Sequence, residues 1–429
     1  MRLGAGGVPA DPPGTRVLLD VRPLQDPERA PVTAAYLRRL LAAYAATPLA
    51  GESFVALLDL GAEDPTAEFS GLAVAGRRRL PPTRIFRSGA LTLDPFFVRG
   101  AGIGAGRGAA ADGAVGVVAH AVAGALPIGP GLPVVATLLD LASWELPEQY
   151  QRTPAARFGQ RLRAQLLRDA ACVLVGSEAV AGAAIRLLRL HPDRVRIVPL
   201  AGDDALGALE PAGTPEGDAA RASLAAERER FGLPERYFVY RGRYDARQDV
   251  GTLLAALGRL ASAGRPARLA RTVTWPPRIL VLGASPDDRA SLARQAFEAG
   301  VGDALAFAPG LPPERVDLLR AGARASIHPM LADATALPVL DALAMGTPIV
   351  GTAVGAVPEA VGSAGLLVPP RDADRLAAAL RAAWTEERVH SAIAAAAAER
   401  AAPGRRTWAN VARGTREAYA AAAATRSRA

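Results

Sequence analysis

Two carboxylates eight residues apart are the first candidates for chemistry in this chain. Asp333 follows a short apolar run that ends at His328, and Asp341 comes eight residues later. Between them Leu337-Pro338 begins a helical pattern, and a proline in the first turn of a helix costs no hydrogen bond. The free amides of such a turn, at the positive end of the helix dipole, attract anions. We expect an anion-binding turn here. For Asp333 a sugar contact and an ordinary turn residue are both open interpretations, and for Asp341 a contact with ribose hydroxyls and a solvated helix residue are both open.

A second turn of the same kind precedes Glu359 and offers backbone amides at Gly355 and Ala356. Glu359 follows a proline in the first turn of a helix, where the dipole favours a carboxylate even without a ligand. Arg243 comes directly after the apolar run Tyr237–Arg241. A phosphate contact and an ordinary surface arginine are both open interpretations for Arg243.

Short aliphatic runs alternate with longer helical patterns through both halves of the chain. This alternation is typical of βαβ units and of parallel sheets covered on both faces. Strands are expected at residues 16–20, 54–58, 114–119, 133–137, 172–175, 195–199, 237–241, 278–283, 304–308, 325–328 and 348–351. Helices are expected at 33–46, 154–169, 177–190, 219–230, 250–263, 290–299, 313–321, 338–345 and 374–384. The fold class is therefore α/β, with two doubly wound, Rossmann-like domains in tandem that face a central cleft.

Composition shifts suggest where these domains begin and end. We expect a flexible N-terminus at residues 1–14 and a first domain at 15–204. Residues 205–235 are rich in Gly, Pro and charge, which predicts an interdomain crossing. A second domain is expected at 236–400, followed by a closing segment at 401–429 that returns to the first domain.

The charge and composition of the 429 residues exclude several classes of function. The formal charge is +8, but the 50 basic residues are all Arg and are dispersed among few aromatics, which argues against nucleic-acid binding. One Cys excludes an internal disulfide, and no His, Cys and carboxylate cluster suggests a metal or a bound cofactor. No signal peptide or apolar stretch of membrane-spanning length is found, which predicts a cytoplasmic protein. Peripheral contact with the inner membrane face through Arg-rich helices stays open.

The segment from Ala325 to Pro369 resembles the donor-site signature of glycosyltransferase family 4, the glycosyl transferases group 1 family of the GT-B fold. That family reads E-G-F-G-L-P-x-x-E-A-M-A-x-G-x-P-V-V, then G-x-x-P-E, then G-x-L-V. The shared residues are Leu337, Pro338, Ala342, Ala344, Gly346, Pro348, Val350, Gly355, Pro358, Glu359, Gly365, Leu367 and Val368. Ser177-Glu178 with Arg196–Gly202, and the closing helix at Trp408–Tyr419, are similar to further family segments. The resemblance covers almost the whole chain in the right order.

The resemblance implies a role for each matching position. Donor binding would involve Arg243, Arg247, Gln248, Ala336, Leu337, Asp341, Gly355 and Glu359. Catalytic candidates would be Asp333, His120 and Arg243. His120 matches a family position at a strand end, where a structural histidine and a contact to sugar or acceptor are both open.

Several positions depart from the family pattern. The signature glutamates are Asp333 and Asp341 here, and each Asp side chain is about 1.5 Å shorter. The family's Gly-Phe-Gly is Ala334-Thr335-Ala336, although Ala adopts a positive φ much less readily than Gly. The family's diphosphate-binding Lys falls at Gln248, beside Arg247. In the first domain, the Gly-rich turn becomes Val32–Ala35 and H-D-L becomes Leu139-Asp140-Leu141.

The resemblance therefore implies an enzyme of the hexosyltransferase class. It would transfer a sugar from a nucleotide-diphosphate sugar to a glycan or lipid-linked acceptor, with retention and without a metal. The altered motifs leave an alternative open. The chain would then be a catalytically degenerate family member that serves as a binding or scaffold protein in polysaccharide assembly.

Overall fold

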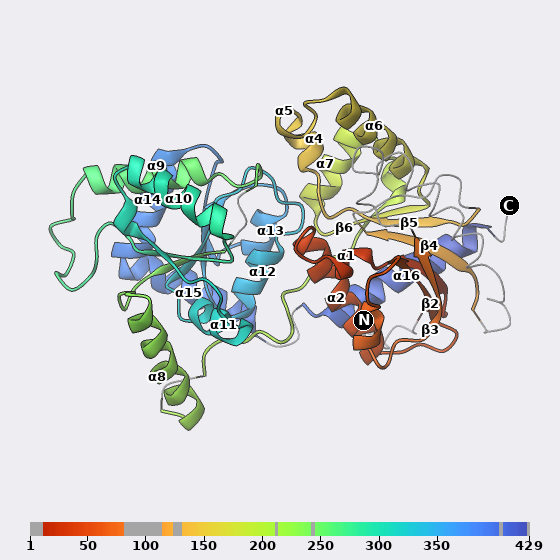
Figure 1. The fold of residues 1–429 in the computed structure, drawn as a ribbon, viewed down its shortest axis with the longest axis horizontal. Coiled ribbons are helices and arrows are strands. Elements are labelled where there is room, and N and C mark those ends of the chain that lie inside the picture. Colours follow the sequence, from red (N-terminus) through yellow and green to blue (C-terminus); the bar gives the residue numbers. More distant parts are fainter. Residues whose placement is uncertain are drawn as a thin grey trace, which may run out of the picture. The chain divides into compact units, whose positions relative to one another are not determined.

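The computed structural model describes residues 12–80, 114–122, 131–210, 213–241, 245–402 and 406–426. Most of the N-terminal segment expected at 1–14 therefore lies outside the described residues. The chain folds into two compact units. Unit 1 comprises Met1–Pro199 with Trp408–Ala429, and unit 2 comprises Leu200–Thr407. Each unit is built on its own parallel sheet (Figure 1).

The sheet of unit 1 has strand order β3-β2-β1-β4-β5-β6-β7, and every pairing is parallel. All five residues of the central strand β1 are buried, because helices cover both faces of such a sheet. The strands are β1 Arg16–Asp20, β2 Ser53–Asp59, β3 Val74–Leu80, β4 Val117–Val122, β5 Val134–Thr137, β6 Cys172–Val175 and β7 Val195–Ile197.

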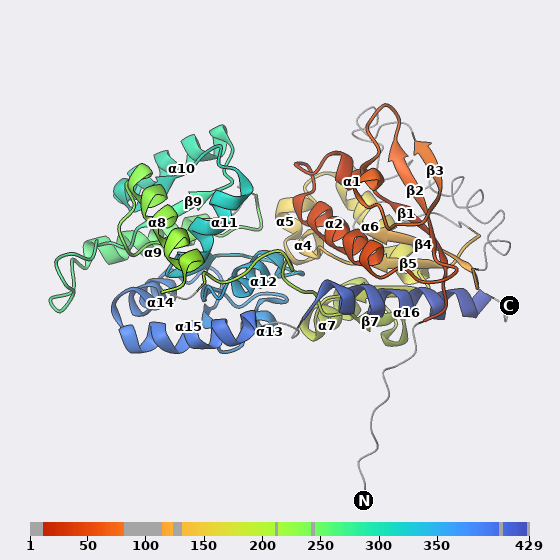
Figure 2. The same cartoon turned by 90° about the horizontal axis from the view of Figure 1, so that it is seen from below.

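The longer helices of unit 1 each bury one face. In α2, Tyr36, Leu37, Leu40 and Tyr44 recur at helical spacing and are all buried. The closing helix α16 packs on α2 and on β4 to β6, and Figure 2 shows the two helices side by side. The helices are α1 Arg22–Gln25, α2 Pro31–Ala46, α4 Ala142–Glu145, α5 Pro147–Tyr150, α6 Pro154–Asp169, α7 Glu178–Leu188 and α16 Trp408–Arg426.

A buried ion pair fastens α16 to the segment before β2. The Arg416 guanidinium donates to both carboxylate oxygens of Glu52, at 2.6 and 2.8 Å, and its Nη1 and Nη2 also donate to Thr47. Both side chains of the pair are only 6% exposed. The guanidinium also lies 4.7 Å from the centre of the Tyr44 ring. Each nitrogen of the Arg416 guanidinium thus has a hydrogen-bond partner in the interior.

The sheet of unit 2 has strand order β10-β9-β8-β11-β12-β13, again wholly parallel. Its strands are β8 Phe238–Arg241, β9 Ile279–Leu282, β10 Leu305–Phe307, β11 Ala325–His328, β12 Ile349–Thr352 and β13 Gly365–Val368. Its helices are α8 Pro215–Arg230, α9 Val250–Ser262, α10 Pro286–Glu298, α11 Pro313–Ala321, α12 Leu337–Ala344, α13 Val357–Val361, α14 Ala373–Thr385 and α15 Glu387–Ala401.

The two faces of this second sheet are buried in separate apolar clusters. Successive side chains of a strand point to opposite faces. Phe238 therefore joins one cluster with Trp384, while Tyr237 joins the other with Leu319. Helix α8 contributes Leu224 to the second cluster and packs on α11, so the charged helix expected in the crossing at 205–235 covers the sheet of unit 2.

The predicted fold class is confirmed, since both units are doubly wound parallel α/β sheets. Two strands and several helices were not expected from the sequence. β3 contains three consecutive arginines, and its charged side chains are tolerated because it is an edge strand. The small residues of α15 (Glu387–Ala401) gave no apolar periodicity, although its alanine run favours a helix. None of the helices within the described ranges has both the length and the apolarity needed to cross a bilayer.

We expect Glu52→Ala to lower the free energy of unfolding by about 3–5 kcal/mol, because it leaves the Arg416 guanidinium buried without its counter-charge. Urea unfolding followed by circular dichroism measures this change. Glu417→Ala is the matched control on α16, since Glu417 is 42% exposed in its pair with Arg196 and its loss should cost under about 1 kcal/mol. Equal losses in the two variants would contradict the buried ion pair.

Candidate functional site

Strands β8, β11, β12 and β13 of unit 2 are neighbours, and being parallel they end at the same edge of the sheet. The loops after these strands carry most of the predicted donor-site residues. Ligands of open α/β sheets bind at this carboxyl edge, where loops and helix N-termini converge. The candidate site is therefore built from the turn before α9, the loop before α12 and the turn before α13.

The turn before α9 holds Arg247 and Gln248. Arg243 lies outside the described residues. The Arg247 guanidinium donates to the Asp245 carboxylate, with an Nη2–Oδ2 distance of 2.6 Å, so its charge is partly neutralised within the turn. The side-chain oxygen of Gln248 accepts a hydrogen bond from the Tyr240 hydroxyl. The turn thus presents one paired cation and one neutral amide to the edge.

Backbone bonds join this turn to the loop that follows β11. Gln248 forms an isolated antiparallel bridge with Met330, and the Asp249 amide donates to the carbonyl of Pro329 at 2.7 Å. The Asp249 carboxylate also accepts from the Arg371 amide at 2.8 Å, which ties in the loop after β13. Three loops of the edge are therefore held together by main-chain groups and one carboxylate.

The Asp333 side chain folds back on its own loop. Its Oδ1 accepts hydrogen bonds from the amides of Thr335 at 3.0 Å and Ala336 at 2.8 Å. Its Oδ2 lies 2.8 Å from Nε2 of His328, and the side chain is only 8% exposed. An aspartate has the right length for such local bonds to the next residues. In this conformation Asp333 acts as a loop-closing group, and one of the amides predicted to bind the donor, that of Ala336, is occupied by it.

The environment of Asp333 keeps its carboxyl ionised. Burial raises the pKa of this group, but the hydrogen bond and charge interaction with His328 and the bonds from the Ala336 and Thr335 amides lower it by more. The net pKa lies below the ordinary value. His328 had no predicted role in the site, although a histidine at a strand end five residues before the carboxylate was the available signal.

The backbone of this loop has a positive φ at Ala336, where the family pattern has glycine. Ala336, the N-cap of α12, has φ of 50°, so this alanine adopts the left-handed region. Gly355 also has φ of 50°, and a Cβ there would lie 1.9 Å from the carbonyl oxygen of Asp333. Only glycine fits at position 355. The Ala356 amide donates to that same carbonyl at 2.9 Å, which holds the two turns together.

Asp341 lies inside α12 and is 4% exposed. Its Oδ1 accepts a hydrogen bond from the backbone amide of Asp203 at 3.1 Å. The carboxylate predicted to meet ribose therefore binds a protein amide in this structure. Gly202, beside Asp203, packs so closely on α12 that a Cβ would lie 2.6 Å from the carbonyl of Leu340. This close approach requires a glycine at position 202.

The remaining predicted donor residues differ in accessibility. The Leu337 amide has a long contact, 3.4 Å, with the Thr335 hydroxyl. The Gly355 amide has no hydrogen-bond partner among the residues that the structure describes. Glu359 is exposed in the first turn of α13. Of the backbone amides predicted to bind the nucleotide sugar, that of Gly355 is best placed to donate a hydrogen bond to a ligand.

His120 lies far inside unit 1, on β4, and is 2% exposed. Its Nε2 is 2.8 Å from the Thr137 hydroxyl and its Nδ1 is 2.6 Å from the Tyr419 hydroxyl on α16. Burial lowers the pKa of His120 from 6.5 to about 3, so the imidazole is neutral. With both ring nitrogens engaged, the structure favours the structural interpretation of His120 over a contact with sugar or acceptor.

The altered motifs of unit 1 form ordinary helix starts. Residues 32–35 lie in the first turn of α2, which begins at Pro31. Asp140 accepts from the Ala142 amide at 2.8 Å at the start of α4. Within the described ranges, no group of three or more His, Cys, Asp or Glu side chains is arranged to hold a metal ion.

Residues 235–386 match the family described as glycosyl transferases group 1. This segment of unit 2 is similar to members of that family over about a third of the chain. The match spans all the loops of the candidate site, from the turn before α9 to the loop after β13. It agrees with the family that the sequence motifs indicated.

Relatives of known name show the same kinship over parts of the chain. The D-inositol 3-phosphate glycosyltransferase of Acidothermus cellulolyticus is 31% identical over 212 residues, which are 46% of this chain and 42% of that protein. The O-antigen chain mannosyltransferase B of Escherichia coli is 25% identical over 57% of this chain and 59% of its own length. The alignments thus span less than two thirds of these relatives.

Solved structures show that the fold is the GT-B fold. Sucrose-phosphate synthase from Thermosynechococcus elongatus aligns with a TM-score of 0.66 and 20% identity, covering 93% of this chain and 96% of that one. The Anabaena protein HepE, in complex with UDP and glucose, aligns with a TM-score of 0.62 and 16% identity over 94% and 98%.

The left-handed backbone at Ala336 predicts an unusual tolerance of glycine. Ala336→Gly loses a buried methyl but relieves about 1–2 kcal/mol of backbone strain. We expect its free energy of unfolding to stay within about 1 kcal/mol of wild type. Ala342→Gly, equally buried but helical, is the control and should cost about 2 kcal/mol. Equal losses on urea unfolding would contradict the left-handed conformation.

The buried neutral imidazole predicts a pH-dependent stability. Between pH 6.5 and about 3 the unfolded chain binds a proton that folded His120 does not. Stability should therefore fall as the pH is lowered through this window, by up to about 1.4 kcal/mol per pH unit from this group. His120→Gln should be less stable at pH 7 but show a shallower dependence in urea unfolding from pH 7 to pH 4. An unchanged slope would contradict the neutral buried state.

Proposed function

We propose that this chain is a hexosyltransferase that binds a nucleotide-diphosphate sugar at the carboxyl edge of unit 2. It transfers the sugar to a glycan or lipid-linked acceptor. The observation that carries the proposal is the family match over residues 235–386, which includes each loop of that edge. The HepE structure with UDP and glucose supports the donor class, and the mannosyltransferase and glycosyltransferase relatives support the reaction class.

In this proposal the protein contributes positioning and electrostatics, without a metal. The bond between the anomeric carbon and the diphosphate oxygen breaks, and the leaving diphosphate takes the bonding electrons. The acceptor oxygen bonds to that carbon as its hydroxyl proton is lost, with retention of configuration. The Gly355 amide, the N-terminal end of α12 and the Arg247 guanidinium would stabilise the charge that develops on the diphosphate. Arg243 is a further candidate for this contact.

The two carboxylates would take part only after rearrangement. Asp333 and Asp341 both accept hydrogen bonds from protein amides in this structure. We propose that a bound ribose competes with the Asp203 amide for Asp341. Asp333 would orient the sugar indirectly, by fixing the conformation of the loop before α12 that contacts the donor.

The same contacts favour a second candidate, a binding or scaffold protein without turnover. Both carboxylates are engaged internally and Gln248 is neutral. A panel of nucleotide diphosphates and their sugars in thermal-shift titrations separates the candidates. A ligand at about 100 times its dissociation constant stabilises by about 2.7 kcal/mol. Binding with transfer supports the enzyme, binding without hydrolysis or transfer supports the second candidate, and no shift with any ligand contradicts the enzyme.

The neutral side chain at position 248 predicts a gain on substitution. Gln248→Lys restores a cation at the edge, and a charge-assisted hydrogen bond to diphosphate should tighten nucleotide-diphosphate binding about tenfold. Isothermal titration calorimetry measures the change. Gln295→Lys on α10 adds the same charge away from the edge and should leave the affinity nearly unchanged. An equal gain in both variants would show that net charge alone is responsible.

A further inference from the structure

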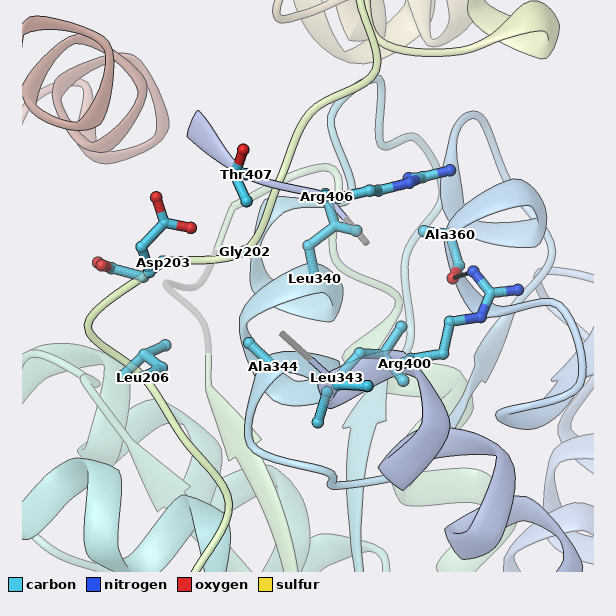
Figure 3. A pocket seen from close by; sticks show the side chains of 13 residues that line it. Gly202, Asp203, Leu206, Leu340, Leu343, Ala344, Ala360, Arg400, Arg406 and Thr407 are labelled. Carbon is cyan, nitrogen blue, oxygen red and sulfur yellow. Dashed lines mark hydrogen bonds between the residues drawn. The ribbon is translucent and has the colours of Figure 1, made fainter. Parts of the chain in front are cut away.

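A cavity of about 540 Å³ lies in unit 2 behind α12, on the side of the helix that carries Leu340, Leu343 and Ala344 (Figure 3). Its size is within the range of small-molecule sites, about 300–1,000 Å³. The remaining walls come from α13, the end of α15 and two chain segments, residues 202–206 and 406–407. These segments adjoin the two points at which the chain passes between the units, after Pro199 and after Thr407.

Charges of opposite sign line this cavity. Arg400 and Arg406 extend on one side, and Asp203 lies on the other side (Figure 3). Asp204 also lines the cavity. Arg400 is held in place, since its Nη1 donates to the Ala360 carbonyl at 2.8 Å.

Arg406 is the freer of the two guanidinium groups. No carboxylate lies within ion-pair distance of it in the described part of the chain. Burial and the nearby charge of Arg400 lower the pKa of Arg406, whereas the charge of Glu359 raises it. Two guanidinium groups on one wall of a cavity favour a bound anion at that wall.

We infer that this cavity is a second ligand site, and that it binds a phosphorylated sugar or polyol. The phosphate would lie against Arg400 and Arg406, whose planar N–H groups suit bidentate contacts with phosphate oxygens. The carboxylates on the other walls accept hydrogen bonds from hydroxyl groups, which an inorganic anion lacks. The apolar surface of Leu340 and Leu343 fits the C–H face of a sugar ring or a carbon chain.

Asp203 connects the cavity to Asp341 of the candidate donor site. Its side chain lines the cavity, while its backbone amide donates to Asp341 at 3.1 Å. A ligand that shifts the segment 202–206 would therefore change the hydrogen bonding of Asp341. This coupling rests on the proposed donor role of Asp341, whereas the binding of the phosphorylated ligand does not.

Isothermal titration of the full chain with a hexose 6-phosphate tests the site directly. We expect saturable binding that Arg406→Ala weakens at least tenfold. Arg388→Ala, an equal change of charge at an exposed position of α15, should leave the affinity within twofold of wild type. Free hexose lacks the phosphate and inorganic phosphate lacks the sugar hydroxyl groups. Each should therefore bind more weakly than the hexose phosphate.

Three results would overturn the inference. They are no binding of the hexose phosphate at millimolar concentration, equal affinities in wild type and Arg406→Ala, and inorganic phosphate binding as tightly as the hexose phosphate. The coupling is tested by titrating nucleotide diphosphate with and without saturating hexose phosphate, since linkage requires the two ligands to change each other's affinity by the same factor. If no nucleotide binds, the proposed function fails while the Arg406 comparison still decides this site.

Discussion

The hydrogen bonds of the Asp333 carboxylate determine the shape of the candidate site. One oxygen accepts the amides of Thr335 and Ala336, and the other pairs with His328 at the end of β11. These bonds hold Ala336 in a left-handed conformation at the start of α12. The carbonyl of the same aspartate accepts the Ala356 amide, and Gly355 must lack a side chain to allow this approach. Two turns of the edge therefore depend on one aspartate.

The length of that side chain has consequences for function. The family signature has glutamate at this position, and a longer side chain would reach beyond the adjacent amides. Aspartate instead bonds to the loop, and Asp341 similarly bonds to the Asp203 amide. The edge keeps the Gly355 amide and the N-terminal end of α12, which the proposed diphosphate contact uses, while its carboxylates are engaged internally. Donor binding is accordingly better supported than turnover.

Much of the fold was predictable because its signals are local and apolar. Runs such as Arg16–Asp20 and Cys172–Val175 are strands at the predicted bounds, and the helix at Pro154–Asp169 begins and ends as expected. The strand β3 was not predicted because its three consecutive arginines interrupt the apolar run that indicates a strand. In the site, the positions of Asp333 and Gln248 were predictable from the motif, but their partners were not. Hydrogen bonds from His328 and Tyr240 depend on tertiary packing that no sequence spacing shows.

The most direct test compares length with charge at position 333. The Asp333→Asn substitution keeps an acceptor oxygen at the same distance from the backbone, whereas Asp333→Glu keeps the charge and displaces both oxygens by about 1.5 Å. Urea unfolding of wild type, Asp333→Asn and Asp333→Glu should give free energies that fall in that order, because the loop-closing bonds depend on geometry. A glutamate variant as stable as wild type, with the asparagine variant clearly weaker, would contradict this account of the loop.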